Sequence, residues 1–215
     1  MKYETLLFDL DGTLTDPGVG ITNSVAYALE KYGIVVEDKS ELYQFIGPPL
    51  HESFERFYGF GKEKAMEAVA FYREYYRDRG IFENAVYDGI RELLCELKQA
   101  GRTLLVATSK PEPFAKIVLE HFGLTEYFDY IAGANMDGTR TKKDEVISYA
   151  LTAGNIAEWP KALMIGDREY DILGAKRVGI DSMGVLYGYG SPEELKRAGA
   201  DFLVKEAGEI AEAAL

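Results

Sequence analysis

Two aspartates near the start of the chain have a spacing that suits chemistry. Asp9 and Asp11 follow the apolar run of residues 5–8, and Gly12 comes next. If the extended conformation persists, both carboxylates project to the same side of the strand, and Gly12 lets the chain turn away. Two like charges so close are costly without a cation. An Asx-type turn that only closes a strand has the same pattern, so both interpretations stay open at this point.

Two further apolar runs end in polar side chains in the same way. Residues 103–107 lead into Thr108, and residues 162–165 lead into Gly166 and Asp167. Such unbroken apolar runs are typical of strands buried on both faces of a parallel sheet. Ligands of these sheets bind beyond the carboxyl ends of the strands. We therefore expect Asp9, Thr108 and Asp167 to meet at one edge of the sheet.

The oxygen-bearing side chains at this edge suit Mg²⁺, which prefers a few hard oxygen ligands and keeps several waters. Asp9, Asp167 and a backbone carbonyl near Asp11 are the expected protein ligands. A transferring phosphoryl group also needs donors for its equatorial oxygens. The Thr108 hydroxyl, the Ser109 amide and one lysine can supply them. With no Cys or His cluster nearby, zinc is a poor candidate.

The positions of strand and helix patterns predict two domains. Helical spacing of apolar residues runs through residues 20–84, whereas strands and helices alternate from Val86 onward. The alternation predicts an α/β fold with a doubly wound, Rossmann-like parallel sheet. We expect residues 1–16 and 85–215 to form this core domain, and residues 17–84 to form an inserted all-helical domain.

Composition limits the possible partners and compartment. The 215 residues include 36 acidic and 24 basic side chains, a formal net charge of -12, which argues against nucleic acid or an anionic membrane as a partner. The single cysteine, Cys95, excludes an internal disulfide, fits a cytoplasmic protein and is expected to pack in a helix. The start of the chain lacks the pattern of a signal peptide, and no apolar run approaches the roughly 18 residues of a membrane span.

Four motifs together resemble those of the haloacid dehalogenase-like phosphatases, in the same order along the chain. They are DLDGT at residues 9–13, the strand-terminal Thr108, the helix-opening Lys143, and GDREYD at residues 166–171. The segments FIGPPL and TSKPEPFA are similar to phosphoglycolate phosphatase-like members, and the overall pattern is also similar to 5′-nucleotidase-like members. The resemblance implies that the helical insertion is a cap of the first cap class.

The resemblance implies a role for each matching residue. Asp9 would be the nucleophile that forms an aspartyl-phosphate, and Asp11 the general acid and base. Thr108, Ser109 and Lys143 would bind the phosphate; Lys142 is the alternative lysine, because the Pro-x-Pro run that follows this lysine in many relatives is absent here. The metal site would comprise Asp9, Asp11, Asp167 and Asp171, with Asp171 either binding the ion or orienting one of its waters.

The resulting functional prediction is a Mg²⁺-dependent phosphoric monoester hydrolase. Its partner would be a small phosphorylated metabolite, and the protein would act as a monomer or homodimer. A β-phosphoglucomutase-like phosphomutase shares the core motifs and is an alternative, as is a binding module without turnover. In the helical domain, Tyr72, Tyr75 and Tyr76 are candidates for contacting the leaving group, although their helical spacing is more typical of packing.

Overall fold

The computed structural model describes residues 2–215, which divide into two compact units. One unit comprises the chain up to Thr15 together with Val86–Leu215, and the other is Asp16–Ala85. Each boundary lies one residue from the predicted one. Among the described helices, none combines the length and the apolar character needed to cross a membrane.

The first unit is built on a parallel sheet of six strands, ordered β5-β4-β1-β6-β7-β8. These strands are β1 (Thr5–Phe8), β4 (Thr103–Pro111), β5 (Tyr130–Ala134), β6 (Ala162–Gly166), β7 (Asp181–Val185) and β8 (Phe202–Val204). Strand order reverses beside β1, since the chain builds outward to β5 on one side and to β8 on the other. The predicted doubly wound α/β fold is confirmed.

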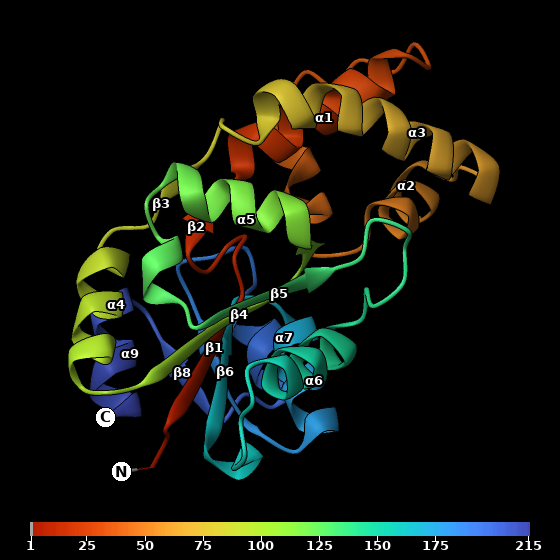
Figure 1. Ribbon diagram of the computed structural model, residues 1–215. Helices are drawn as coiled ribbons and strands as arrows, with labels where there is room; N and C mark the ends of the chain where they lie inside the picture. The colour runs from red at the N-terminus through yellow and green to blue at the C-terminus, as the bar shows by residue number, and fades with distance from the viewer. Residues whose placement is uncertain (1) are drawn as a thin grey trace. The chain divides into compact units, whose positions relative to one another are not determined.

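Helices cover both faces of this sheet. They are α4 (Ile90–Gln99), α5 (Glu112–His121), α6 (Lys143–Ala153), α7 (Glu169–Val178), α8 (Pro192–Ala198) and α9 (Ala207–Ala214), with short 3-10 turns η3 (Thr125–Tyr127) and η4 (Trp159–Lys161). In Figure 1, α4 and α9 lie together on one face, while α6 and α7 lie together on the other. Buried side chains of β1, β4 and β6 pack under α6 and α7. The central strands are therefore buried on both faces, as their apolar sequences require.

Cys95 departs from the prediction of a packed thiol, because it is exposed. The buried positions of α4 are Ile90, Leu93, Leu94 and Leu97. At about 3.6 residues per turn these four share one face, and Cys95 falls on the opposite side of the helix.

The second unit is helical, as predicted. It contains α1 (Gly18–Glu30), η1 (Lys39–Phe45), α2 (Leu50–Tyr58), α3 (Lys62–Tyr75) and the π-helical turn η2 (Tyr76–Gly80). Tyr72 and Tyr76 are buried and their rings stack at 5.2 Å, so these two tyrosines pack inside the unit. Two short strands, β2 (Thr15–Asp16) and β3 (Ala85–Val86), form a separate sheet where the chain crosses the unit boundary.

A close approach of backbones links α1 to η2 within this unit. Gly20 donates its amide to the Glu83 carbonyl at 2.9 Å, and a Cβ at Gly20 would lie 1.9 Å from the Gly80 carbonyl oxygen. Because the nearest atoms belong to the backbone carbonyls of Gly80 and Glu83, no side-chain rotation can make room for a methyl group. Only glycine fits at position 20.

We expect Gly20→Ala to destabilise the helical unit by about 1–3 kcal/mol, since the added methyl forces the backbones apart. Val19→Ala, at an exposed position of the same helix, is the matched control and should change stability by less than about 0.5 kcal/mol. Urea unfolding followed by circular dichroism measures both. Equal midpoints for Gly20→Ala and wild type would contradict the predicted clash.

Candidate active site

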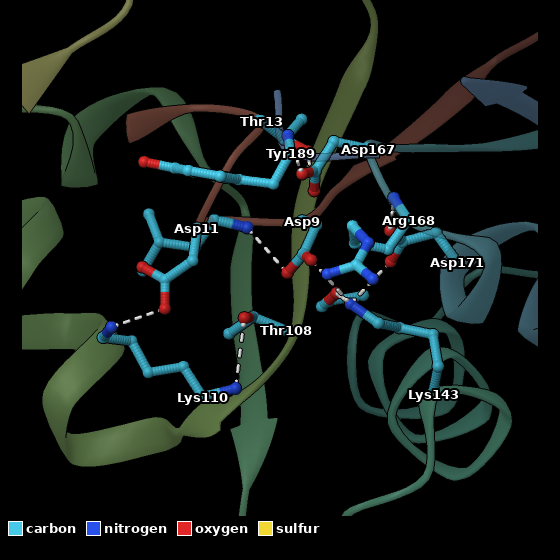
Figure 2. Close-up of polar contacts among 12 residues, drawn as sticks. Asp9, Asp11, Thr13, Thr108, Lys110, Lys143, Asp167, Arg168, Asp171 and Tyr189 are labelled. Carbon is cyan, nitrogen blue, oxygen red and sulfur yellow. Dashed lines mark hydrogen bonds and ion pairs between the residues drawn. The ribbon is translucent and has the colours of Figure 1, made fainter. Parts of the chain in front are cut away.

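Three neighbouring strands end together at one edge of the core sheet. β1 lies between β4 and β6 in parallel register, with Phe8 opposite both Val106 and Ile165. The residues that follow these positions therefore leave the sheet at the same edge, beside the point where strand order reverses. The structure accordingly brings Asp9 and Asp167 together, and in the view of Figure 2 Asp9 lies between Asp167 and Thr108.

The turn after β1 is folded tightly on itself. The Leu10 carbonyl accepts hydrogen bonds from the amides of Thr13, Leu14 and Thr15, at 2.9–3.3 Å. Gly12 has φ +84°, and a Cβ there would lie 2.2 Å from Oδ2 of Asp167. A side chain at position 12 would thus be strained and would also collide with the carboxylate. The glycine is what lets the turn lie directly against Asp167.

Lys143 connects the ends of three elements through its ammonium group. Its Nζ lies 3.0 Å from Asp9 Oδ2 and 2.7 Å from Asp171 Oδ1, and it donates to the Ala107 carbonyl at 3.2 Å. The lysine opens α6 and is buried, whereas its neighbour Lys142 is exposed. The structure therefore places Lys143, and not Lys142, beside Asp9 (Figure 2).

Asp167 is held by groups from two separate loops. The Tyr189 amide donates to its Oδ2 at 2.8 Å, and the Thr13 hydroxyl lies 3.4 Å from its Oδ1. A Cβ at Gly188 would lie 2.3 Å from the Gly12 carbonyl oxygen, so the segment after β7 passes very close to the turn after β1. This segment was not assigned to the site from the sequence. The sequence feature that could have indicated it is the pair of glycines in YGYG at residues 187–190, since glycines permit such a close approach of backbones.

Asp9, Asp167 and Asp171 form one group of buried carboxylates. One oxygen from each lies within 4.8 Å of the others, a geometry that can hold a metal ion. Asp9 Oδ1 accepts the Leu10 amide at 2.7 Å, and Asp171 Oδ2 accepts the Arg168 amide at 3.0 Å. These backbone bonds fix the Asp9 carboxylate at the end of β1 and the Asp171 carboxylate in the first turn of α7, so the group is preorganised.

The charges in this group are only partly balanced, because Lys143 pairs with Asp9 and Asp171 but not with Asp167. Burial raises the pKa of Asp167 well above its ordinary value, and Asp171 and Asp9 raise it further. Burial also raises the pKa of Asp171 to about 6, although Lys143 opposes this change. Burial disfavours the Lys143 ammonium, but Asp171 and Asp9 outweigh it and raise the lysine pKa. The group therefore favours an additional cation.

Thr108, Ser109 and Lys110 leave the regular sheet in a bulge of β4. Ala107 pairs with Ala132 and Pro111 with Ala134, so four steps along β4 match two along β5. Thr108 is buried, Ser109 is partly exposed, and the Thr108 hydroxyl accepts the Lys110 amide at 3.2 Å. Since a hydroxyl that accepts this bond keeps its own proton, Thr108 can still donate to a ligand.

Asp11 lies apart from the group of three carboxylates. Its Oδ2 pairs with Nζ of Lys110 at 2.6 Å, on the opposite side of Asp9 from Lys143 (Figure 2). Burial raises the pKa of the Asp11 carboxyl, and Lys110 opposes the rise. A contribution of Asp11 to a metal site through its backbone carbonyl stays a prediction. The Lys110–Asp11 pair was not foreseen from the sequence.

The charge balance leads to a prediction for the metal-free protein. Lys143→Met would leave Asp9 and Asp171 buried without their ammonium partner, so we expect a loss of roughly 3–5 kcal/mol in unfolding free energy near neutral pH. Lys142→Met is the matched control, because that side chain is exposed one position earlier. Urea unfolding in the presence of a chelator measures both variants. An unchanged midpoint for Lys143→Met would show that the carboxylates do not depend on this lysine.

Comparisons with known proteins agree with this arrangement. The sequence model of the haloacid dehalogenase-like hydrolase family matches residues 6–185. A 5′-nucleotidase of Pseudomonas aeruginosa is 50% identical over 196 residues, which are 91% of this chain and 88% of that protein. The tyrosine-protein kinase PtkA of Mycobacterium tuberculosis is 44% identical over 87% of this chain, and the match spans 63% of that longer protein.

Solved structures give the same result. A crystal structure described as that of a predicted phosphatase from Clostridium acetobutylicum superposes with a TM-score of 0.96 at 51% identity, covering 99% of this chain and 98% of that one. The family match covers both ends of the site, from the turn after β1 to the aspartates after β6. The chain belongs to the haloacid dehalogenase-like hydrolases and is a phosphatase of that family.

Proposed function

We propose that this protein is a Mg²⁺-dependent phosphatase that hydrolyses small phosphomonoesters through an aspartyl-phosphate on Asp9. The observation that carries the proposal is the position of Asp9, whose carboxylate lies 3.0 Å from Nζ of Lys143 and within one group with Asp167 and Asp171. A nucleophile, a phosphate-binding cation and a cation-binding group thus converge on one point at the edge of the sheet.

The residues present fit a magnesium ion. Their donors are hard carboxylate oxygens, the ligand type that Mg²⁺ prefers. Burial and neighbouring carboxylates raise the pKa of Asp167 and of Asp171, so a bound cation would offset an unfavourable concentration of negative charge. Asp9, Asp167 and Asp171 are the residues that would hold the ion, with Asp171 acting directly or through a water. When bound, the ion would neutralise these carboxylates and withdraw electron density from a phosphoryl oxygen.

The protein's own groups then perform a two-step displacement. A carboxylate oxygen of Asp9 attacks phosphorus, the bond to the leaving oxygen breaks, and Asp11 donates a proton to that oxygen. Lys143, the Thr108 hydroxyl and the Ser109 amide donate to the phosphoryl oxygens, where negative charge concentrates. Asp11 next takes a proton from water, which displaces Asp9 from phosphorus and releases inorganic phosphate.

The named relatives suggest which substrates to test first. The 50% identical relative is named 5′-nucleotidase, and a 28% identical relative from Colwellia psychrerythraea is named phosphoglycolate phosphatase. We therefore place nucleoside 5′-monophosphates first and 2-phosphoglycolate second among candidate substrates. A cytoplasmic location and a monomeric or dimeric state stay predictions.

A direct test compares hydrolysis of 4-nitrophenyl phosphate by wild type and by Asp9→Asn, with and without added magnesium. We expect Asp9→Asn to lose at least about 10³-fold in kcat, because no other described carboxylate holds its place at the end of β1. Asp137→Asn, in an exposed loop, is the control and should retain wild-type activity. Equal activity of wild type and Asp9→Asn would overturn the proposal. Isomerised product without free phosphate would instead indicate a phosphomutase.

Magnesium affinity should depend on pH in a defined direction. The folded-state pKa of Asp171 is about 6 against an ordinary 3.8, so the metal-free folded protein holds this proton more strongly than the unfolded chain does. Its contribution to stability is greatest at low pH and falls as pH rises through this window. Because magnesium must displace the proton, we expect binding about fourfold or more weaker near about pH 5.5 than near about pH 7.5.

Isothermal titration calorimetry at the two pH values measures this difference. Thermal unfolding gives a second reading, since saturating magnesium should raise the melting temperature more at the higher pH. Asp137→Asn should show the same pH dependence as wild type. Affinity that does not change with pH would contradict the assignment of the carboxylate group as the metal site.

A further inference from the structure

Lys110 is a second buried lysine at this edge of the sheet, and the displacement described above does not use it. Its side chain is 5% exposed, and its Nζ lies 2.6 Å from Oδ2 of Asp11. Burying a lysine carries a large desolvation cost, so a buried ammonium normally has a specific partner. Here that partner is the proposed general acid. Lys143, by contrast, lies against Asp9 and Asp171.

The two oxygens of the Asp11 carboxylate have different surroundings. Oδ2 is paired with Lys110, whereas Oδ1 is buried and has no hydrogen-bond partner among the described residues. A buried acceptor without a partner has lost its bonds to water and gained none in return. The carboxylate is thus anchored by one oxygen, and its other oxygen is available for a group that the resting protein does not contain.

The backbone around Lys110 is fixed by a hydrogen bond from its amide and by the strand pairing that resumes at the next residue. The Lys110 amide donates to the Thr108 hydroxyl, and Pro111 returns to the sheet opposite Ala134 before α5 begins. The bulge therefore presents two side chains from one short segment: the Thr108 hydroxyl, which is proposed to bind phosphate, and the Lys110 ammonium, which pairs with Asp11. Because the anchor and the phosphate-binding hydroxyl share this segment, their relative positions are set by the same backbone.

We propose that Lys110 is a positioning residue that holds Asp11 by Oδ2, so that Oδ1 meets the leaving-group oxygen of the substrate. This inference rests on the proposed phosphatase function and on the role of Asp11 as its general acid. The two lysines then have different roles. Lys143 donates to the phosphoryl oxygens, and Lys110 holds the proton donor Asp11 on the other side of Asp9 (Figure 2).

The proposal makes the effect of Lys110 depend on the leaving group. An alkoxide leaving from a nucleoside 5′-monophosphate needs a proton as the bond to phosphorus breaks, whereas 4-nitrophenolate is stable enough to leave without one. Loss of the anchor should therefore harm hydrolysis of the first substrate far more than that of the second. A general loosening of the site would harm both equally.

The experiment measures kcat/KM for adenosine 5′-monophosphate and 4-nitrophenyl phosphate with wild type, Lys110→Met and the control Lys142→Met. We expect the kcat/KM of Lys110→Met to fall about 10²-fold or more with the nucleotide and less than about tenfold with the aryl ester. Lys142→Met, exposed and outside the site, should match wild type with both. Asp11→Asn should show the same discrimination, and the double variant should lose little more than either single one.

The outcomes separate the inference from the function on which it rests. Suppose that wild type is active and that the kcat/KM of Lys110→Met either falls equally with both substrates or does not fall with either. The positioning role is then overturned, while the phosphatase function stands. If wild type hydrolyses neither substrate, the proposed function fails and the inference fails with it. Should Lys110→Met not fold, Lys110→Gln keeps a donor without the charge. It must then show an intermediate loss confined to the nucleotide.

Discussion

The arrangement at the edge of the core sheet depends on one electrostatic constraint: three buried carboxylates lie together, and one buried ammonium, that of Lys143, pairs with two of them. The lysine contacts Asp9 and Asp171 directly and bonds the backbone of β4 as well. Like charges packed so closely would drive the strand ends apart without it. The remaining negative charge is also the feature that makes this edge a candidate cation site. The same interaction therefore serves both stability and the proposed chemistry.

The supporting structure keeps these charges within reach of one another. Gly12 lets the turn after β1 lie against Asp167, and Gly188 lets the segment after β7 pass beside that turn. Backbone amides hold Asp9, Asp167 and Asp171 from three different loops. Sites fixed by backbone donors on rigid strands lose little energy to reorganisation during a reaction. This is why we place the proposed chemistry, which relies on fixed charges, where β1, β4 and β6 end.

Much of this could be predicted from the sequence, because the informative signals are local. An apolar run that ends in an aspartate identifies both a buried strand and the residue at its end, so the sequence alone is enough to assign Asp9 and Asp167. The doubly wound sheet and the helical insertion follow from periodicity in the same way. The prediction for Cys95 was wrong because the helical period places it opposite the buried face of α4, although it directly follows Leu94 in the sequence.

The rest of the site depends on contacts between residues far apart in the chain. Lys110 and Asp11 are separated by 99 positions. The segment TSKPEPFA around Lys110 carries a family resemblance, but nothing in it indicates that this lysine is buried against Asp11. Its direction is set by a bulge in β4, which has no reliable sequence signature. The segment after β7 also could not be assigned from the sequence, since its glycines are needed only because the turn after β1 lies against them.

In the proposed mechanism Asp9 accepts the phosphoryl group, with Lys143 and a magnesium site beside it. A crystal structure of the wild-type protein grown with magnesium and beryllium fluoride, which mimics an aspartyl-phosphate, tests this role most directly. We expect beryllium bonded to a carboxylate oxygen of Asp9, the Lys143 ammonium within hydrogen-bond distance of a fluorine, and magnesium in contact with Asp167. Beryllium on another carboxylate, or magnesium bound away from Asp9 and Asp167, would contradict the mechanism.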